Sequence, residues 1–276
     1  MEKVRVGRIQ YINVAPVYHG IDGSNPPFTV VPGSPSTLNR MVLDGELDVS
    51  PVSSVAYARH HDRLVVVPGL SISCFGRVMS VLLASQSPLD ELDGKKIAVT
   101  DESETAACFL KLYFSQKGIT PLFVETVACP CKELADRGFD SALAIGDLAL
   151  TQNWEGCFRY VWDVGEMWQE LATLPFVFAL WVVRKEFAEK HADKVSEVVR
   201  YLHDSKRKGM SETDKVAQRS AATLGLPIET CRKYYSLLSY DLGQSEIEGV
   251  ETFFDMLYSR GILPGRVRLS FCRCDF

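Results

Sequence analysis

The sequence predicts an α/β protein of two lobes with mixed, mainly parallel sheets, and three observations carry this prediction. The chain has 276 residues, 46% of them hydrophobic, and so approaches the length of roughly 250–300 residues at which single hydrophobic cores stop growing. Short β-rich segments alternate with helical ones, which is typical of parallel strands joined by helices. No repeat or long linker interrupts the pattern, so we expect short hinges between the lobes.

The first elements are a strand, a loop, a second strand and a helix. Residues 4–9 and 28–32 are β-rich, and prolines and glycines punctuate the segment between them. Residues 37–43 carry leucines and a methionine at helical spacing, after a Ser-Pro-Ser capping sequence and before a glycine. Residues 47–52 then read as a buried strand.

Two further apolar runs, residues 65–67 and 78–84, continue the first sheet. Turn-forming residues follow them, among them a Ser-Pro and an Asp-Gly pair. We place the first crossing between the lobes at these turns. The first lobe is therefore expected to hold residues 1–84 and 182–276, and the inserted second lobe residues 85–181.

The inserted lobe reads as two units of strand and helix. Residues 95–100 form a strand, and residues 106–116 carry a helical apolar pattern that ends before a glycine. In the second unit we expect strands at 123–128 and 141–145 and a helix at 132–137. This alternation of strands and helices predicts a mainly parallel sheet.

The return to the first lobe is a buried strand at residues 175–183, and the chain beyond it is helical. We expect helices at 186–208, 212–224, 228–238 and 245–260, because glycines, a proline and a polar turn separate these periodic segments. This helical tail should pack on the first lobe.

The charge pattern argues against a nucleic-acid partner, because 30 basic and 35 acidic residues give a net charge of −5 and are scattered along the chain. A small anionic ligand is compatible with this balance, since a few placed donors can bind it. Charges interrupt residues 1–6, where a signal peptide would be apolar. The longest uncharged stretches, 78–89 and 171–183, are shorter than the roughly 18 residues of a membrane span. We therefore expect a cytoplasmic protein with no membrane partner.

The sequence predicts neither a metal site nor a bound cofactor. The eight cysteines form no Cys-x-x-Cys pair, and the two Cys-x-Cys pairs have the wrong spacing for a zinc knuckle. None of the five histidines is near a glycine-rich elbow or a second ligand at suitable spacing. Glycine-rich phosphate-binding and dinucleotide-binding motifs are also missing. We expect free thiols, no metal and no cofactor.

Polar and small residues follow the carboxyl ends of several predicted strands, where ligands bind in open α/β sheets. Backbone N–H groups at helix starts can receive an anion there. Each position also has a structural reading, because Ser and Thr at a helix start are commonly caps, and Asn, Gly and Asp are turn residues. The positions are Tyr11, Asn13, Ser53, Ser54, Ser103, Thr105, Ala106, Gly146 and Asp147.

Six stretches, taken in order, resemble motifs of the chorismate dehydratases of the futalosine route to menaquinone. The first, Val6-Gly7-Arg8-Ile9-Gln10-Tyr11-Ile12-Asn13-Val14-Ala15-Pro16-Val17, is similar to the Tyr-Leu-Asn-x-x-Pro opening of those enzymes. One motif alone is weak, whereas six in order over roughly two-thirds of the chain are specific. The others are Gly45-Glu46-Leu47-Asp48 with residues 52–57, then residues 76–83, 103–106, 144–147 and 168–181.

The resemblance implies a fold like that of type 2 periplasmic binding proteins, with the active site in the cleft between the lobes. It also implies the reaction. Chorismate loses water, the proton leaving the carbon that bears the enolpyruvyl ether and hydroxide leaving the next ring carbon, to give 3-[(1-carboxyvinyl)oxy]benzoate. Because aromatising the ring is strongly downhill, positioning and electrostatics suffice without a metal or cofactor.

The resemblance further implies roles for particular residues. Asn13 orients the reacting part of the ring while the substrate's own enolpyruvyl carboxylate takes the proton, and Asp147 and Glu102 are less favoured acid or base candidates. Arg77 adds a charge-assisted hydrogen bond. Family members more often have Thr-Ser where this chain has Thr105-Ala106, which leaves only a backbone donor there. The remaining substrate contacts are expected from Tyr11, Ser53, Ser80, Ser103, Thr105, Ala106, Gly146 and Asp147.

Other functions with the same fold stay open. The related pathway enzyme that acts on cyclic dehypoxanthine futalosine depends on a histidine base in the second lobe, and this chain has no histidine between His61 and His191. A non-enzymatic binding protein for a small anionic solute would share the fold and the loops, and a signal peptide or lipid-anchor cysteine would favour it. A sensory ligand-binding module is a third alternative. The oligomeric state is open too, with a homodimer as one expectation.

Overall fold

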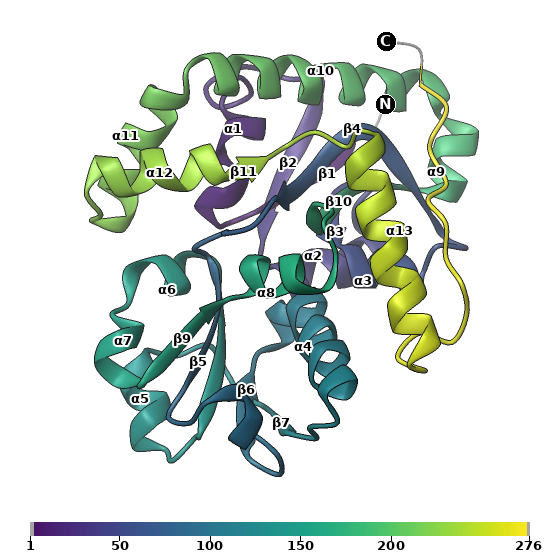
Figure 1. Ribbon diagram of the computed structural model, residues 1–276. Helices are drawn as coiled ribbons and strands as arrows, with labels where there is room; N and C mark the ends of the chain where they lie inside the picture. The colour runs from purple at the N-terminus through teal and green to yellow at the C-terminus, as the bar shows by residue number, and fades with distance from the viewer. Residues whose placement is uncertain (1–2, 275–276) are drawn as a thin grey trace.

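The computed structural model describes residues 3–274, which fold into two α/β lobes, one above the other in Figure 1. The predicted two-lobed α/β architecture is confirmed. Met1 and Glu2, at the charged start of the chain, lie outside the described residues.

The upper lobe in Figure 1 is built on a six-stranded sheet within the described residues. Its strands are β1 (Val4–Ile9), β2 (Phe28–Gly33), β3 (Val49–Ser53), β4 (Leu64–Cys74), β10 (Phe176–Arg184) and β11 (Leu238–Ser239). They lie in the order β11-β4-β10-β3-β1-β2. Its helices are η1 (Ile12–Val14), α1 (Ala15–Tyr18), α2 (Pro35–Leu43), α3 (Ser54–Arg59), α9 (Lys185–Lys190), α10 (Ala192–Ser211), α11 (Thr213–Leu224), α12 (Ile228–Leu237) and α13 (Gln244–Ser259).

The lower lobe is built on a five-stranded sheet, again within residues 3–274. Its strands are β5 (Val81–Ser85), β6 (Lys96–Val99), β7 (Leu122–Glu125), β8 (Ser141–Ile145) and β9 (Tyr160–Asp163). They lie in the order β7-β6-β8-β5-β9. Its helices are η2 (Leu89–Glu91), η3 (Asp101–Ser103), α4 (Glu104–Lys117), α5 (Cys131–Asp136), α6 (Gly146–Thr151), α7 (Trp154–Cys157) and α8 (Val164–Leu171).

Both expected lobe boundaries are wrong, because each falls inside a strand. The boundary after residue 84 cuts β5, which pairs with β8 and β9 and so belongs to the lower sheet. The boundary after residue 181 cuts β10, which pairs with β3 and β4 of the upper sheet. The chain therefore crosses between the sheets at residues 75–80 and 172–175.

The sheets are mixed as expected, but they are not mainly parallel. β1 runs parallel to β2 and β3, and β6 runs parallel to β7 and β8. The strands next to the two crossings pair antiparallel: β10 with β3 and β4, and β5 with β8 and β9. The short strand β11 is also antiparallel to β4. A strand that enters a sheet from the other lobe can arrive in the opposite direction, which local helix–strand alternation does not reveal.

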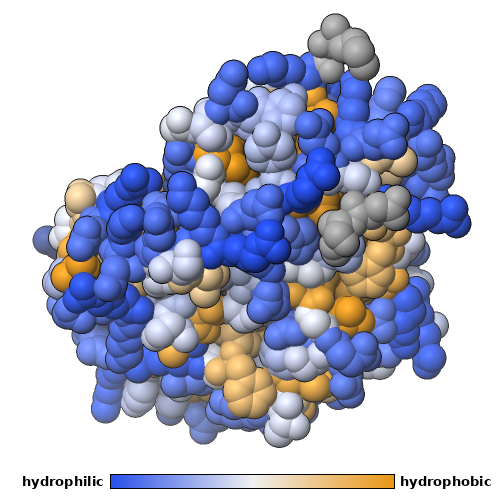
Figure 2. Space-filling view, turned by 90° about the horizontal axis from the view of Figure 1, so that it is seen from above, coloured by the Kyte–Doolittle hydropathy of each residue, from blue (hydrophilic) through white to orange (hydrophobic). Residues whose placement is uncertain are grey.

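The helical tail packs on the upper lobe as predicted. α10 packs one face against the upper lobe, and this face carries the buried residues Val195, Val198, Val199 and Leu202. Seen from above, the molecule is covered mostly by hydrophilic residues with scattered hydrophobic ones, as expected for amphipathic surface helices (Figure 2). The helix predicted at 186–208 is interrupted, because His191 has φ −137° and ψ 44° and separates α9 from α10.

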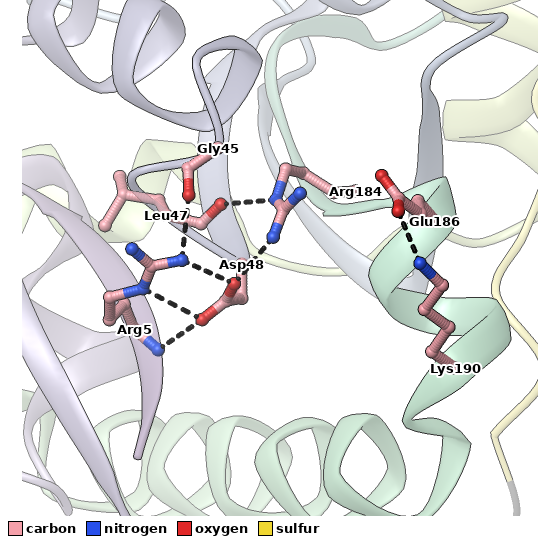
Figure 3. A network of polar contacts seen from close by, with 7 residues as sticks. All are labelled: Arg5, Gly45, Leu47, Asp48, Arg184, Glu186 and Lys190. Carbon is pink, nitrogen blue, oxygen red and sulfur yellow. Dashed lines mark hydrogen bonds and ion pairs between the residues drawn. The ribbon is translucent and has the colours of Figure 1, made fainter. Parts of the chain in front are cut away.

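A buried carboxylate holds three strand ends of the upper lobe together (Figure 3). Asp48, with 5% of its side chain exposed, lies 2.9 Å from Nη2 of Arg5 and 3.0 Å from Nη2 of Arg184. Arg5 comes from β1 and Arg184 ends β10. Burial alone would raise the pKa of Asp48, but the hydrogen bonds from Arg5 and Arg184 outweigh it and lower the pKa.

We expect Asp48→Asn to lower the free energy of unfolding by about 2 kcal/mol at neutral pH, because two guanidinium groups lose their charged acceptor. A lowered native pKa means that the carboxylate stabilises the fold above the unfolded pKa near about 4 and loses this effect as pH falls through the native pKa. Urea unfolding of both proteins from pH 3 to pH 7 measures the difference, which should shrink below about pH 4.

The exposed pair Glu186–Lys190, also drawn in Figure 3, provides the control. Glu186→Gln should leave the unfolding midpoint unchanged, because water screens exposed ion pairs. An equal loss of stability in both variants would contradict the argument for Asp48.

Candidate active site

The candidate active site is a cleft lined by residues of both lobes. Of the residues expected to contact the substrate, all except Arg77 and Asp147 line it, and so does Glu102. Ser54, a further candidate position, does not line it, and its hydroxyl donates to the carbonyl of Val177 at 2.8 Å. The predicted residues in the cleft are Tyr11, Asn13, Ser53, Ser80, Ser103, Thr105, Ala106 and Gly146. In the upper lobe, Tyr11 and Asn13 follow β1, and Ser53 is the last residue of β3. In the lower lobe, Ser80 precedes β5, residues 103, 105 and 106 follow β6, and Gly146 follows β8. The rule that ligands bind beyond strand ends therefore located most of the cleft.

Tyr11 joins the lobes across the cleft. Its hydroxyl donates a hydrogen bond to Glu102, which lies just after β6. Burial and this hydrogen bond raise the pKa of the Tyr11 phenol well above its ordinary value. Gly146 makes room for the ring, because a Cβ there would lie 2.7 Å from the Tyr11 ring and the residue has φ +62°. Only glycine fits both the space and the backbone conformation.

Asn13 carries an unpaired buried atom at the wall of the cleft. Its Oδ1 is shielded from solvent and has no hydrogen-bond partner within residues 3–274. A buried acceptor without a donor is costly, and native proteins keep one mostly where a ligand or water supplies the missing partner. The Asn13 amide is therefore a polar group at the cleft wall whose oxygen still lacks a hydrogen-bond donor among the described residues.

Ser80 is oriented by a residue that sequence reasoning missed. Tyr234, on α12, lines the cleft, and its hydroxyl donates a hydrogen bond to Ser80 Oγ at 3.0 Å. Because Ser80 Oγ accepts this bond, its own hydrogen is available for a ligand. A tyrosine on an amphipathic helix far along the chain looks like a core residue, so no local signal marked it.

The other predicted hydroxyls are already engaged by the protein. Ser53 Oγ donates to Glu104 at 2.7 Å and caps α3 by accepting from the N–H of Ala56. Ser103 Oγ donates to the carbonyl of Thr100 at 2.6 Å. The structural reading thus holds for these side chains, which leaves Asn13 and Ser80 as the better placed polar contacts.

The start of α4 offers backbone donors to the cleft. Thr105 and Ala106 lie in the first turn of this 14-residue helix and line the cavity. The first N–H groups of a helix have no partner within the helix, and its dipole favours an anion there. A substrate carboxylate can be bound at this position without a cationic side chain.

Arg77 and Asp147 are not brought into the cleft. Arg77 is exposed on the crossing segment 75–80 and does not line the cavity. Asp147 instead accepts a hydrogen bond from the N–H of Ile12 at 3.0 Å, which ties the lower lobe to the loop that carries Asn13. Burial raises the pKa of Asp147 to about 6, although the hydrogen bond from Ile12 opposes this.

The described residues hold no group of three or more His, Cys, Asp or Glu side chains arranged to bind a metal ion. The eight cysteines are all free thiols. In the part of the chain that the structure describes, no helix is both long and apolar enough to cross a membrane.

Solved structures with the same architecture are periplasmic-binding-protein-like. The protein AF1704 from Archaeoglobus fulgidus has a TM-score of 0.75 and 20% identity, covering 94% of this chain and 98% of that one. The CA3427 gene product of Candida albicans, which has the generic periplasmic binding protein fold, has a TM-score of 0.70 and 10% identity, covering 100% and 99%. The expected fold is confirmed.

Two relatives from Thermus thermophilus are similar in sequence. A chorismate dehydratase is 30% identical over 91% of this chain and 94% of the relative. A 1,4-dihydroxy-6-naphtoate synthase is also 30% identical, but over 66% of this chain and 65% of the relative. The family model described as menaquinone biosynthesis matches residues 4–259. With nearly the whole described chain matched, both lobes and the cleft included, this protein belongs to the menaquinone biosynthesis family.

Proposed function

We propose that this protein is a chorismate dehydratase, a hydro-lyase that converts chorismate into 3-[(1-carboxyvinyl)oxy]benzoate. The observation that carries the proposal is the similarity to a chorismate dehydratase over nearly the full length of both chains. The cleft supports it, because its open donors and acceptors suit a small polar anion and its walls are largely apolar, as a ring requires.

The cleft can bind the substrate with neutral groups. One carboxylate meets the backbone N–H groups at the start of α4, near Thr105 and Ala106. Ser80 donates its free hydroxyl hydrogen, oriented by Tyr234. The unpaired Oδ1 of Asn13 accepts a hydrogen bond from the ring hydroxyl and so aligns the reacting carbons.

The elimination then needs only one proton acceptor. The enolpyruvyl carboxylate of the substrate removes the proton from the carbon that bears its ether, the electron pair forms the new ring double bond, and hydroxide leaves the next carbon. The removed proton and the hydroxide combine to water, which leaves the substrate carboxylate ionised again, and the aromatic product is released. The protein contributes alignment and a site with little water, where hydrogen bonds to the charges are strong.

The alternative in the same family, the synthase, is less favoured. That enzyme depends on a histidine base in the second lobe, and residues 62–190 of this chain contain no histidine. The match to the synthase also covers a smaller part of both chains than the match to the dehydratase.

The proposal is tested by incubating purified, metal-stripped protein with chorismate and following the products by mass spectrometry. An aromatic product lighter than chorismate by one water molecule is expected. Chorismate that is bound but recovered unchanged would identify a binding protein and refute the proposed activity.

We infer that the enzyme works in the cytoplasm, since its proposed substrate is a small water-soluble metabolite.

A homodimer stays a prediction, which light scattering of the purified protein would check.

Tyr234→Phe is expected to lower kcat/KM for chorismate about tenfold, because the Ser80 hydroxyl loses the hydrogen bond that orients it. Steady-state kinetics measure the change. Tyr240→Phe is the matched control, since the buried Tyr240 hydroxyl has no partner within residues 3–274. Equal rates for Tyr234→Phe and the native protein would remove Tyr234 from the positioning of Ser80.

A further inference from the structure

The last described residues return to the upper lobe and are bound there through their backbone. After α13 the chain runs back beside that helix (yellow in Figure 1) and pairs with the start of β4. The N–H of Val66 donates to the carbonyl of Ser270 at 2.7 Å, and the N–H of Cys272 donates to the carbonyl of Val66 at 2.9 Å. These two hydrogen bonds fix the position of the backbone that carries Cys272.

The Cys272 thiol lies next to a second thiol two residues further along the chain. Its Sγ is 2.9 Å from Sγ of Cys274. A shift of less than about 1 Å brings the two sulfurs to the length of a disulfide bond. Cys272 is buried, with 7% of its surface exposed, whereas Cys274 is partly exposed. One sulfur is therefore open to a small molecule, and the other is shielded but within reach of the first.

The other Cys-x-Cys segment of the chain has a different geometry. Sγ of Cys129 lies 3.8 Å from Nη1 of Arg137, and Sγ of Cys131 lies 3.6 Å from the carbonyl oxygen of Asn153. These two sulfurs have different neighbours although their spacing in the sequence is the same. The spacing alone thus does not bring two thiols together, and in the C-terminal segment the backbone pairing with β4 positions them.

We propose that Cys272 and Cys274 form a redox-active dithiol, which a small disulfide such as oxidised glutathione converts into an internal disulfide. The Cys274 thiolate attacks the small disulfide, forms a mixed disulfide and releases one thiolate. The Cys272 thiolate then attacks the Cys274 sulfur, forms the bond between the two cysteines and releases the second thiolate. The two cysteines lose two protons and two electrons, and the small disulfide gains them as two thiols.

This dithiol responds to the redox state around the protein and not to the substrate of the cleft. Neither cysteine lines the cleft, so the proposal does not depend on the activity proposed there. Disulfides in a reducing cytoplasm are usually transient and catalytic or redox-sensing. We therefore expect the pair to be reduced under ordinary conditions and to close when small disulfides accumulate.

The test exposes the native protein to oxidised glutathione, alkylates the remaining thiols and digests the chain with trypsin without reduction. Trypsin cuts after Arg268 and Arg273, which places the two cysteines in separate peptides, 269–273 and 274–276. Mass spectrometry should find these peptides joined by a disulfide, and dithiothreitol should separate them. Two separate alkylated peptides after oxidation would overturn the proposal, and so would a 274–276 peptide joined to the same peptide of a second chain.

Two variants separate the roles of the two sulfurs. Cys272→Ser should keep one glutathione on Cys274, because no second thiol is present to displace it. Cys274→Ser should stay unmodified at Cys272, since that thiol is buried. Glutathione on Cys272 of the second variant, and none on Cys274 of the first, would contradict the order of the two steps.

A comparison with the urea-unfolded chain tests whether the fold contributes. The native protein should form the disulfide with an equilibrium constant about tenfold larger than the unfolded chain, because the fold already holds the two sulfurs together. Equal constants would show that closeness in the sequence alone pairs the thiols and would overturn the role given to the fold. No step uses chorismate, so the outcome leaves the proposed function untouched.

Discussion

Asn13→Ala is expected to dehydrate chorismate roughly 10²–10³-fold more slowly than the native protein, the loss typical of removing one oriented polar group from an active site. The substitution removes the buried, unpaired Oδ1 of a residue that lines the cleft. Because this atom is proposed to align the reacting carbons, kcat should fall much more than KM rises. Appearance of the aromatic product under saturating chorismate measures the change.

The same variant should fold normally. Asn13 Oδ1 has no partner within residues 3–274, so alanine breaks no hydrogen bond at this atom and relieves a buried polar group. Thermal unfolding should therefore occur at the native temperature or above it. A variant with native turnover would exclude Asn13 from the mechanism, and a variant that loses stability and turnover together would give it a structural role instead.

Elements with a local signal were predictable to within a residue or two. The strands expected at 4–9 and 141–145 coincide with β1 (Val4–Ile9) and β8 (Ser141–Ile145). Helix α2, the first one that was predicted, is capped as expected, with Ser34 Oγ accepting from the N–H of Thr37. In each case a short, mostly buried apolar run or a capping residue acts over a few neighbours, and the sequence shows it directly.

The pairing of strands was not predictable, and the misplaced lobe boundary shows why. β5 is an apolar strand that suits either sheet by composition, and its partners β8 and β9 come more than fifty residues later. Sheet membership is decided by long-range packing, which leaves no pattern in the strand itself. The short elements α6, α7 and β9 were missed for a different reason, since too few residues carry their periodicity.

The site was predictable where it lies on strand ends and unpredictable where the tertiary fold supplies it. Tyr11, Asn13 and Gly146 follow strands of different lobes and meet in the cleft. Tyr234 reaches the cleft from the helical tail, and no sequence pattern separates it from a core tyrosine. Arg77 was expected in the cleft for its charge and its place in a family-like motif, but it lies on the crossing segment and is exposed to solvent.

Asp163→Ala is expected to be the most destabilising single change at the junction of the lobes. The carboxylate of Asp163 is buried at the end of β9 and accepts hydrogen bonds from three backbone N–H groups. The donors are Val78 at 3.0 Å, Met79 at 2.7 Å and Gly165 at 2.9 Å. Alanine leaves all three without an acceptor, which should lower the free energy of unfolding by about 3–5 kcal/mol.

These hydrogen bonds also stabilise the backbone of Met79 in a conformation that is otherwise unfavourable. Met79 has φ +64°, a left-handed value that costs a residue with a Cβ about 1–2 kcal/mol. Without Asp163, Met79 can relax to an ordinary backbone conformation. Ser80, which follows Met79, then loses its hydrogen bond with the Tyr234 hydroxyl. We therefore expect KM for chorismate to rise in Asp163→Ala at temperatures where the variant is still folded.

Urea unfolding and steady-state kinetics at low temperature separate the two effects. Asp140→Ala is the matched control, because the Asp140 carboxylate accepts from a single exposed backbone N–H, that of Lys96 at 3.0 Å, and its loss should cost less than about 1 kcal/mol. If Asp163→Ala costs no more than this control, the carboxylate does not hold the crossing. If stability falls but KM stays native, Ser80 is positioned by Tyr234 alone, and the geometry of the cleft does not depend on the strained residue before it.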